Sequence, residues 1–188
     1  RYAIIFILLF VNFSLLAGQN KNTLQTPSDY LGYELGSQFT LHHKVLDYVE
    51  HAAEQSNRVV MEHYGTTYEG RDLVYAVVTS PQNHDRLEEI RRSNIAQTGL
   101  GDGDTIEDQP AVVWLSYNVH GNEASASEAA MKTLHHLAKE NSQKVREWLD
   151  NTVVIIDPML NPDGRDRYVN WFKQTRGQHP IANEETRE

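Results

Sequence analysis

The chain has 188 residues, enough for one domain with a core of reasonable size. Its 17 lysines and arginines against 26 aspartates and glutamates give a formal net charge of -9, spread along the chain, so the basic patch that nucleic-acid binding needs is missing. The absence of cysteine excludes disulfides, thiolate metal ligands and a cysteine-linked lipid anchor, so any metal must be bound by histidine and carboxylate.

Residues 1–18 have the composition of a secretory signal peptide. One positive residue is followed by an almost unbroken apolar run and then by small residues at Ala17 and Gly18. The run is about as short as a membrane-spanning helix can be, roughly 17 residues, and polar residues interrupt it, so a retained N-terminal anchor is the less favoured alternative. We therefore expect a secreted or periplasmic protein without stable membrane insertion once the signal is removed. Residues 19–36 are turn-rich and are expected to be irregular.

Helical and strand patterns alternate in the first half of the chain. Residues 39–56 predict an amphipathic helix. Residues 58–67 and 73–80 are rich in strand formers and are separated by a glycine-containing turn, which predicts an antiparallel pair. Residues 81–96 begin with proline and early acidic residues and end with arginines, as suits one helix, and residues 97–109 form a loop without the spacing of a calcium site. The apolar face of the first helix consists of Leu41, Val45, Tyr48, Val49 and Ala52.

The second half predicts a parallel strand, helix, strand unit. Residues 111–117 and 152–157 are short, nearly all apolar and β-branched, which is typical of strands buried on both faces. Residues 124–150 between them are long enough for one helix and a further turn, with Ser125 and Glu128 at capping-box spacing. Such a crossover is almost always right-handed. The buried stripe of the helix is expected to be Ala130, Leu134, Leu137 and Ala138.

His120 and Glu123 follow the first of these strands. Ligand-binding groups collect at the carboxyl ends of strands in an open α/β sheet. An imidazole and a carboxylate are ligands that Zn²⁺ accepts, and a catalytic zinc site needs three protein ligands and one position for water. Gly121 permits a sharp bend between the two side chains. A hydrogen-bonded histidine before a helix, with Glu123 as a first-turn acid, is an equally good interpretation of these four residues alone.

Other polar groups have ordinary structural interpretations. The sequence Asn-Pro-Asp-Gly at residues 161–164 makes a turn without any function, and the arginines at positions 165, 167 and 176 fit solvated or paired surface residues. His136 and Glu140 lie one turn apart on a helix and could in principle share a metal. Exposed histidine and glutamate are common on helices, however, so this pair is not favoured.

The order of these features resembles the zinc carboxypeptidase family of metallopeptidases. An apolar strand, "HGNE", an alanine-rich helix, a second apolar strand, "NPDG" and arginines follow one another at suitable intervals, and "YEGRDLVYAVVTS" precedes them. The spelling "NPDGRDRYVNW" is similar to that of bacterial secreted members. The resemblance implies an α/β fold with a mixed, largely parallel sheet flanked by helices, of zinc-peptidase type. Residues 37–188 would then be the N-terminal part of the catalytic domain, truncated before its C-terminal half.

Position by position, the resemblance implies that His120 and Glu123 are the first two ligands of one zinc ion, with the third beyond Glu188. Asn122 stands where the family often has a substrate-binding arginine. The arginine that polarises the scissile carbonyl falls on Arg176 when residues are counted without gaps from the "NPDG" motif, and Arg165 and Arg167 are rivals. The late histidine ligand, the Asn-Arg pair and the general-base glutamate have no counterpart, since His179 is too close to "NPDG".

The implied function is that of a zinc-dependent metallocarboxypeptidase, which hydrolyses the C-terminal peptide bond of peptides with a zinc-activated water. The 188-residue chain alone is expected to be inactive and poorly soluble, because a sheet edge would be left uncovered. One alternative is the related deacylase branch, a zinc-dependent deacylase of small N-acyl amino acids. Another is a non-catalytic peptide-binding or cell-wall-binding module that keeps the fold.

Overall fold

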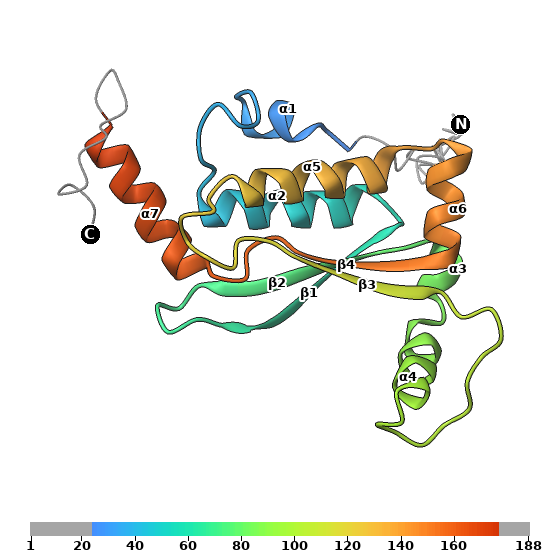
Figure 1. Ribbon diagram of the computed structural model, residues 1–188. Coiled ribbons are helices and arrows are strands. Elements are labelled where there is room, and N and C mark those ends of the chain that lie inside the picture. The colour runs from blue at the N-terminus through green and yellow to red at the C-terminus, as the bar shows by residue number, and fades with distance from the viewer. Residues whose placement is uncertain (1–23, 177–188) are drawn as a thin grey trace, which may run out of the picture.

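The computed structural model describes residues 24–176 (Figure 1). The signal peptide expected at residues 1–18 and His179 lie outside this range. In the described part of the chain, no helix is long and apolar enough to cross a membrane. Within the segment expected to be irregular, Pro27–Leu31 form a short helix, α1, because Thr26 Oγ1 accepts a hydrogen bond from the Asp29 N–H and a proline occupies the first helical position.

Four strands form one mixed sheet in the order β1-β2-β4-β3. The expected antiparallel pair is confirmed as β1 and β2, and β4 joins β2 in antiparallel orientation. The parallel unit is confirmed by the pairing of β3 with β4, which is the one parallel pairing among the described strands. The strands are β1 Val59–Thr66, β2 Asp72–Val78, β3 Ala111–Ser116 and β4 Thr152–Asp157.

Two long helices cover one face of the sheet. Helices α2 (His42–Gln55) and α5 (Ala126–Lys139) lie side by side over the strands (Figure 1). Both predicted apolar faces are confirmed, since the helical residues of each stripe are buried in the core. Helix α6 (Gln143–Asn151) provides the further turn that leads into β4.

The prediction of a single helix over residues 81–96 is wrong, because the helix is interrupted at Arg86. Helix α3 (Pro81–His84) ends two residues before Arg86, and α4 (Leu87–Gln97) begins directly after it. Asn83 is buried, and its Nδ2 donates to the carbonyl oxygens of Leu149 and Asp150 at 3.0 Å each. This anchor ties the first turn to the end of α6, and Arg86 adopts a non-helical φ of -126°. The break therefore depends on a distant segment.

The expectation that both apolar strands are buried on both faces holds for β4 and is wrong for β3. Strand β3 is at the edge of the sheet, and 57% of Trp114 is exposed. Helix α4 covers part of the face opposite α2 and α5, where Ile90 contacts Val77 and Val153. On this face Tyr75 lies 6.0 Å from Trp114, between ring centroids. Helices α2 and α5 thus leave this aromatic surface uncovered.

We expect a Trp114→Lys variant to be more soluble than the unaltered chain. A lysine on an edge strand opposes pairing with a second chain, and the loss of one largely exposed side chain should change the free energy of unfolding little. Light scattering at increasing protein concentration measures the effect. Trp148→Lys is the matched control, since Trp148 is 46% exposed on helix α6 and not on a strand. Equal improvement in both variants would contradict a role for the β3 edge.

Candidate metal centre

The loops that follow β3 and β4 meet at one edge of the sheet, as the parallel unit predicted. Tyr117 N–H donates to the Asp157 carbonyl at 3.0 Å, and Leu160 N–H donates to the Tyr117 carbonyl at 3.0 Å. One residue further on, Asn161 N–H donates to the Asn118 carbonyl at 3.2 Å. The two loops therefore continue the pairing of their strands and bring the "HGNE" and "NPDG" motifs together.

His120 and Glu123 are joined within one tight turn. His120 N–H donates to Glu123 Oε2 at 3.1 Å, and Glu123 N–H donates to the His120 carbonyl at 3.0 Å. Asn118 is buried at a φ of 56°, and its Nδ2 donates to the same His120 carbonyl at 2.7 Å. Both candidate ligands are exposed. The turn thus holds an imidazole and a carboxylate at the surface in a fixed backbone arrangement.

The expected bend between His120 and Glu123 is present, but Gly121 is needed for a close approach and not for its backbone conformation. Its φ lies outside the left-handed region, so a side chain would cause no backbone strain there. A Cβ at this position would instead lie 2.2 Å from the carbonyl carbon and oxygen of Gly164. Gly121 therefore packs against the backbone of Gly164, which explains the glycine of the "HGNE" motif, whereas a Cβ at Gly164 would meet the Asn161 side chain at 2.8 Å.

The "NPDG" motif starts helix α7 (Pro162–Thr175) and holds the neighbouring loop at the same time. Asn161 is the N-cap residue, and its Oδ1 accepts a hydrogen bond from Gly164 N–H at 2.9 Å. Its Nδ2 donates to the Val119 carbonyl at 3.1 Å. The motif is thus the N-cap and first helical turn of α7 and not the isolated turn that was expected, and the Asn161 side chain links α7 to the loop of the candidate ligands.

Arg165 has a structural role. It is completely buried, and its guanidinium donates to Glu128 Oε1 at 2.9 Å and Oε2 at 3.1 Å, and to Ser127 Oγ at 3.0 Å. Burial lowers the pKa of Arg165 from its ordinary value, although the nearby Glu128 carboxylate opposes this. Arg165 therefore cannot reach a substrate in this arrangement.

The capping box expected at the start of α5 is wrong for the same reason. Among the described residues, Ser125 makes no side-chain capping hydrogen bond. Glu128 is 5% exposed, and its carboxylate is paired with Arg165 and also accepts a hydrogen bond from Thr40 N–H at 2.6 Å. A buried guanidinium is a stronger partner for a carboxylate than a helix-end N–H. Glu128 therefore pairs with Arg165, although its spacing from Ser125 predicted a capping box.

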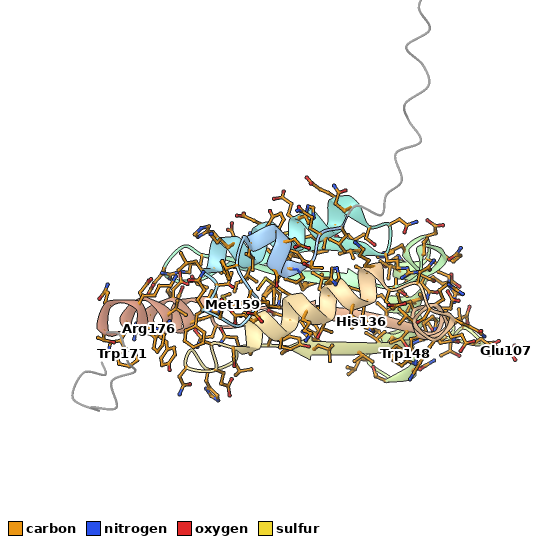
Figure 2. All side chains as sticks on the ribbon, turned by 90° about the horizontal axis from the view of Figure 1, so that it is seen from above. Glu107, His136, Trp148, Met159, Trp171 and Arg176 are labelled. Carbon is orange, nitrogen blue, oxygen red and sulfur yellow. The ribbon has the colours of Figure 1, made fainter. Side chains whose placement is uncertain are left out.

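Of the other two candidate arginines, Arg167 lies on α7 and Arg176 directly follows it. The Arg167 side chain is 73% exposed, with a guanidinium nitrogen 3.8 Å from a Glu69 carboxylate oxygen. Arg176 follows the last residue of α7, with its guanidinium 5.7 Å from the centre of the Phe172 ring. A helix of this length spans about 20 Å, and Figure 2 shows Arg176 near one end of the molecule. The structure thus does not bring Arg176 together with His120 and Glu123.

The donor set fits part of a zinc site. An imidazole and a carboxylate on one turn are suitable ligands, and within residues 24–176 no hydrogen-bond partner occupies the His120 ring. The same residues contain no group of three or more metal-binding side chains. Glu140 leaves the helix of His136 and accepts Ser142 N–H at 2.9 Å, so that pair is not arranged for a metal. A catalytic zinc would need its third ligand from outside residues 24–176.

The chain is similar to a known protein family over much of its length. A model of the zinc carboxypeptidase family matches residues 45–183, which include both motifs. The chain belongs to the zinc carboxypeptidase family. The sequence resemblance to this family is thereby confirmed, and its members use zinc. The comparison with curated proteins gives no match.

One solved structure supports the fold of this family member. Carboxypeptidase A from Helicoverpa armigera is 18% identical, with a TM-score of 0.53 over 76% of this chain and 31% of that chain. Thrombin activatable fibrinolysis inhibitor is 16% identical, with a TM-score of 0.48 and the same coverage of 76% and 31%. The chain therefore spans less than a third of the length of these two proteins. The first likeness confirms the α/β fold with a mixed sheet.

Proposed function

We propose that the chain carries part of the active site of a zinc metallocarboxypeptidase that removes C-terminal residues from peptides. One observation carries the proposal: the turn that joins His120 to Glu123 is locked onto the start of α7 at the carboxyl edge of β3 and β4. Membership of the zinc carboxypeptidase family supports the choice of metal and reaction. The composition of residues 1–18 supports secretion or a periplasmic location for the protein.

In this proposal His120 and Glu123 are two of three protein ligands. A bound zinc would supply a water of lowered pKa and a Lewis acid for the substrate carbonyl. The chain itself supplies rigid ligand placement, because Asn118 and Asn161 hold the loop by its carbonyl oxygens. Since Arg165 is buried and Arg176 is remote from the turn, tests for a carbonyl-polarising arginine should also include Arg167.

We expect His120→Ala and Glu123→Ala each to weaken zinc binding by more than about 100-fold, since even the loss of an outer-shell partner weakens metal binding by roughly 10–100-fold. Zinc content by mass spectrometry and hydrolysis of blocked dipeptides by the product of the whole gene measure the effect. The 188-residue chain alone should bind zinc weakly and release nothing.

His136→Ala is the control, because His136 is exposed on α5 away from the turn. Stoichiometric zinc and unchanged hydrolysis in His120→Ala and Glu123→Ala would overturn the proposal. Release of the acyl group from N-acyl amino acids without cleavage of dipeptides would favour the deacylase alternative. Absence of both zinc and hydrolysis in the unaltered protein would favour a binding module.

A further inference from the structure

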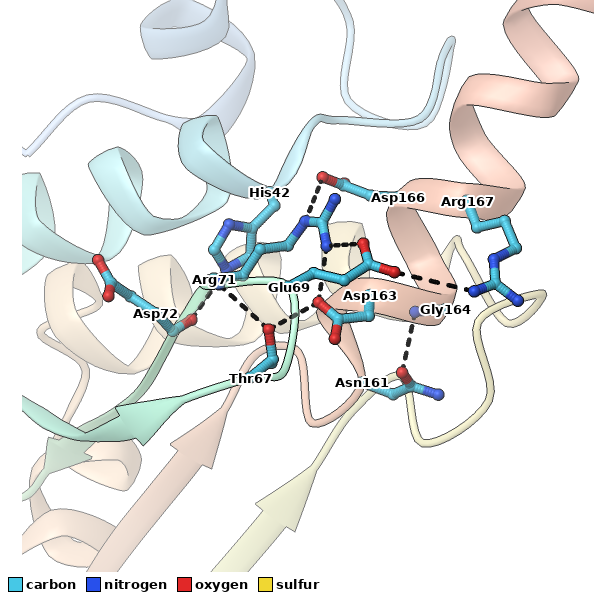
Figure 3. A network of polar contacts seen from close by, with 10 residues as sticks. All are labelled: His42, Thr67, Glu69, Arg71, Asp72, Asn161, Asp163, Gly164, Asp166 and Arg167. Atoms are coloured by element: carbon cyan, nitrogen blue, oxygen red, sulfur yellow. Dashed lines mark hydrogen bonds and ion pairs between the residues drawn. The ribbon is translucent and has the colours of Figure 1, made fainter.

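The turn between β1 and β2 has a defined backbone shape. Thr67 N–H donates to the Arg71 carbonyl at 2.9 Å, and Gly70 N–H donates to the Thr67 carbonyl at 3.0 Å. Arg71 N–H in turn donates to Thr67 Oγ1 at 3.1 Å. Gly70 has a φ of +76°, which favours glycine at this position. The turn therefore presents the Arg71 side chain in a fixed direction, towards the start of α7 (Figure 3).

Arg71 bridges two carboxylates of the first turns of α7. Its guanidinium contacts Asp163 Oδ1 at 2.7 Å and Asp166 Oδ2 at 2.9 Å (Figure 3). Thr67 Oγ1 adds a hydrogen bond to Asp163 Oδ1 at 2.7 Å, and Glu69 forms a further ion pair with Arg71. The side chains of Arg71, Asp163 and Asp166 are 24%, 22% and 16% exposed, so solvent screens these pairs less than it screens fully exposed ones.

The charge on Asp163 agrees with this arrangement. Partial burial opposes ionisation, but the hydrogen bonds from Thr67 and Arg71 outweigh it and hold the pKa of Asp163 below its ordinary value. Arg71 is therefore the cation that Asp163, Asp166 and Glu69 share, while Arg167 lies 3.8 Å from Glu69 alone. Without it, like charges would face one another across the hairpin and α7.

The same first turn of α7 is in contact, on its other side, with the loop that carries His120 and Glu123. This loop, residues 118–123, is called the metal loop below. Asn161 caps the helix and binds the Val119 carbonyl, while Gly164 lies against Gly121. Asp163 stands between these two residues in the sequence. The hairpin and the loop of His120 thus hold one short piece of backbone from two sides, and a shift of that piece would move both.

We propose that Arg71 is a positioning residue for the metal loop: by holding the first turn of α7, it fixes the turn that carries His120 and Glu123. The effect on zinc rests on the proposed function, whereas the effect on the loop does not. Arg71 itself contacts neither candidate ligand and acts through Asp163, Asn161 and the two packed glycines.

Hydrogen exchange of the full chain tests the effect on the loop. In Arg71→Gln, the amides of His120, Asn161 and Gly164 should exchange at least about tenfold faster, while the amides of β4 change little, because a local opening leaves the sheet intact. Arg71→Lys should behave in the same way, since a lysine cannot bridge two carboxylates with a planar fork. The control is Arg91→Gln, which removes an exposed ion pair with Glu88 on α4.

Unchanged exchange at the three loop amides would overturn the proposal. An equal increase in β4 would also overturn it, because it would show a general loss of stability. If Arg71→Gln does not fold, the charge-preserving Arg71→Lys variant decides between these outcomes.

Zinc affinity of the whole gene product tests the metal part separately. We expect Arg71→Gln to bind zinc about tenfold more weakly, at the lower end of the range for residues that support ligands. If the unaltered protein binds zinc through His120 and Arg71→Gln binds it equally well, the positioning role is wrong and the proposed function stands. If the unaltered protein binds no zinc, the proposed function fails, and the exchange rates still decide whether Arg71 holds the loop.

Discussion

Replacing Glu128 with alanine is expected to lower the free energy of unfolding by about 3–5 kcal/mol, the range for breaking a buried ion pair by removing one partner. Arg165 is completely buried and would be left without its carboxylate. Thr40 N–H, in a residue that is also completely buried, would lose its acceptor. Urea unfolding followed by circular dichroism measures this loss.

Two further variants show whether the unpaired charge causes the effect. The double variant Glu128→Leu with Arg165→Met removes both charges and should recover most of the loss, because replacement of a whole buried pair by apolar residues is often neutral. Glu88→Ala removes an exposed carboxylate that pairs with Arg91 and Arg92, and it should leave stability almost unchanged. A double variant as unstable as Glu128→Ala would contradict this explanation.

The buried pair also affects how activity data should be interpreted. It joins α5, which follows the "HGNE" loop, to α7, which begins in the "NPDG" motif. In the product of the whole gene, a variant of Arg165 would therefore lose the proposed hydrolytic activity by unfolding, although this arginine was one of three sequence candidates for a role on the substrate. The loss of activity should follow the loss of thermal stability, which distinguishes Arg165 from a residue that contacts substrate.

Local sequence patterns correctly predicted the elements whose own apolar spacing determines which residues are buried. Helices α2 and α5 and strand β4 followed from apolar spacing, because each presents its stripe or its length to the core. Strand β3 is as short as β4 and also rich in apolar residues, but it lies at an edge, and composition cannot show which strand has a neighbour on both sides. The break at Arg86 depends on Asn83 binding carbonyl groups at the end of α6, which no local pattern records.

The same distinction between local and distant contacts applies to the candidate site. His120 and Glu123 could be selected from spacing and from their place after a strand, and the turn that joins them is local. The roles of Gly121, Arg165 and Arg71 could not, because each depends on a partner that is distant in the sequence. Asn161 offers a partial signal, since Asn before Pro is typical of a helix start, although the motif was interpreted as a turn and the bond to Val119 depends on a distant residue.

The close approach of the two motifs makes Gly121→Ala the most disruptive small substitution that we expect in the metal loop. The added Cβ would lie 2.2 Å from backbone atoms of Gly164, and backbone cannot rotate away as a side chain can. We expect a loss of about 1–3 kcal/mol in the free energy of unfolding, the range for an overpacked core position, together with weaker zinc binding. Urea unfolding and zinc titration measure the two effects.

Alanine substitutions at two other glycines are the matched controls, because the added methyl group would meet different neighbours at each position. In Gly164→Ala the nearest atom is Asn161 Nδ2 at 2.8 Å, so a side chain must move and the loss should be smaller, although the helix cap is weakened. In Gly65→Ala the Cβ meets nothing within 4 Å, and stability should be kept or slightly raised because the unfolded chain loses freedom. The reverse order would mean that the "HGNE" loop is free to move away from α7, and the locked turn on which the proposed zinc site depends would then not exist.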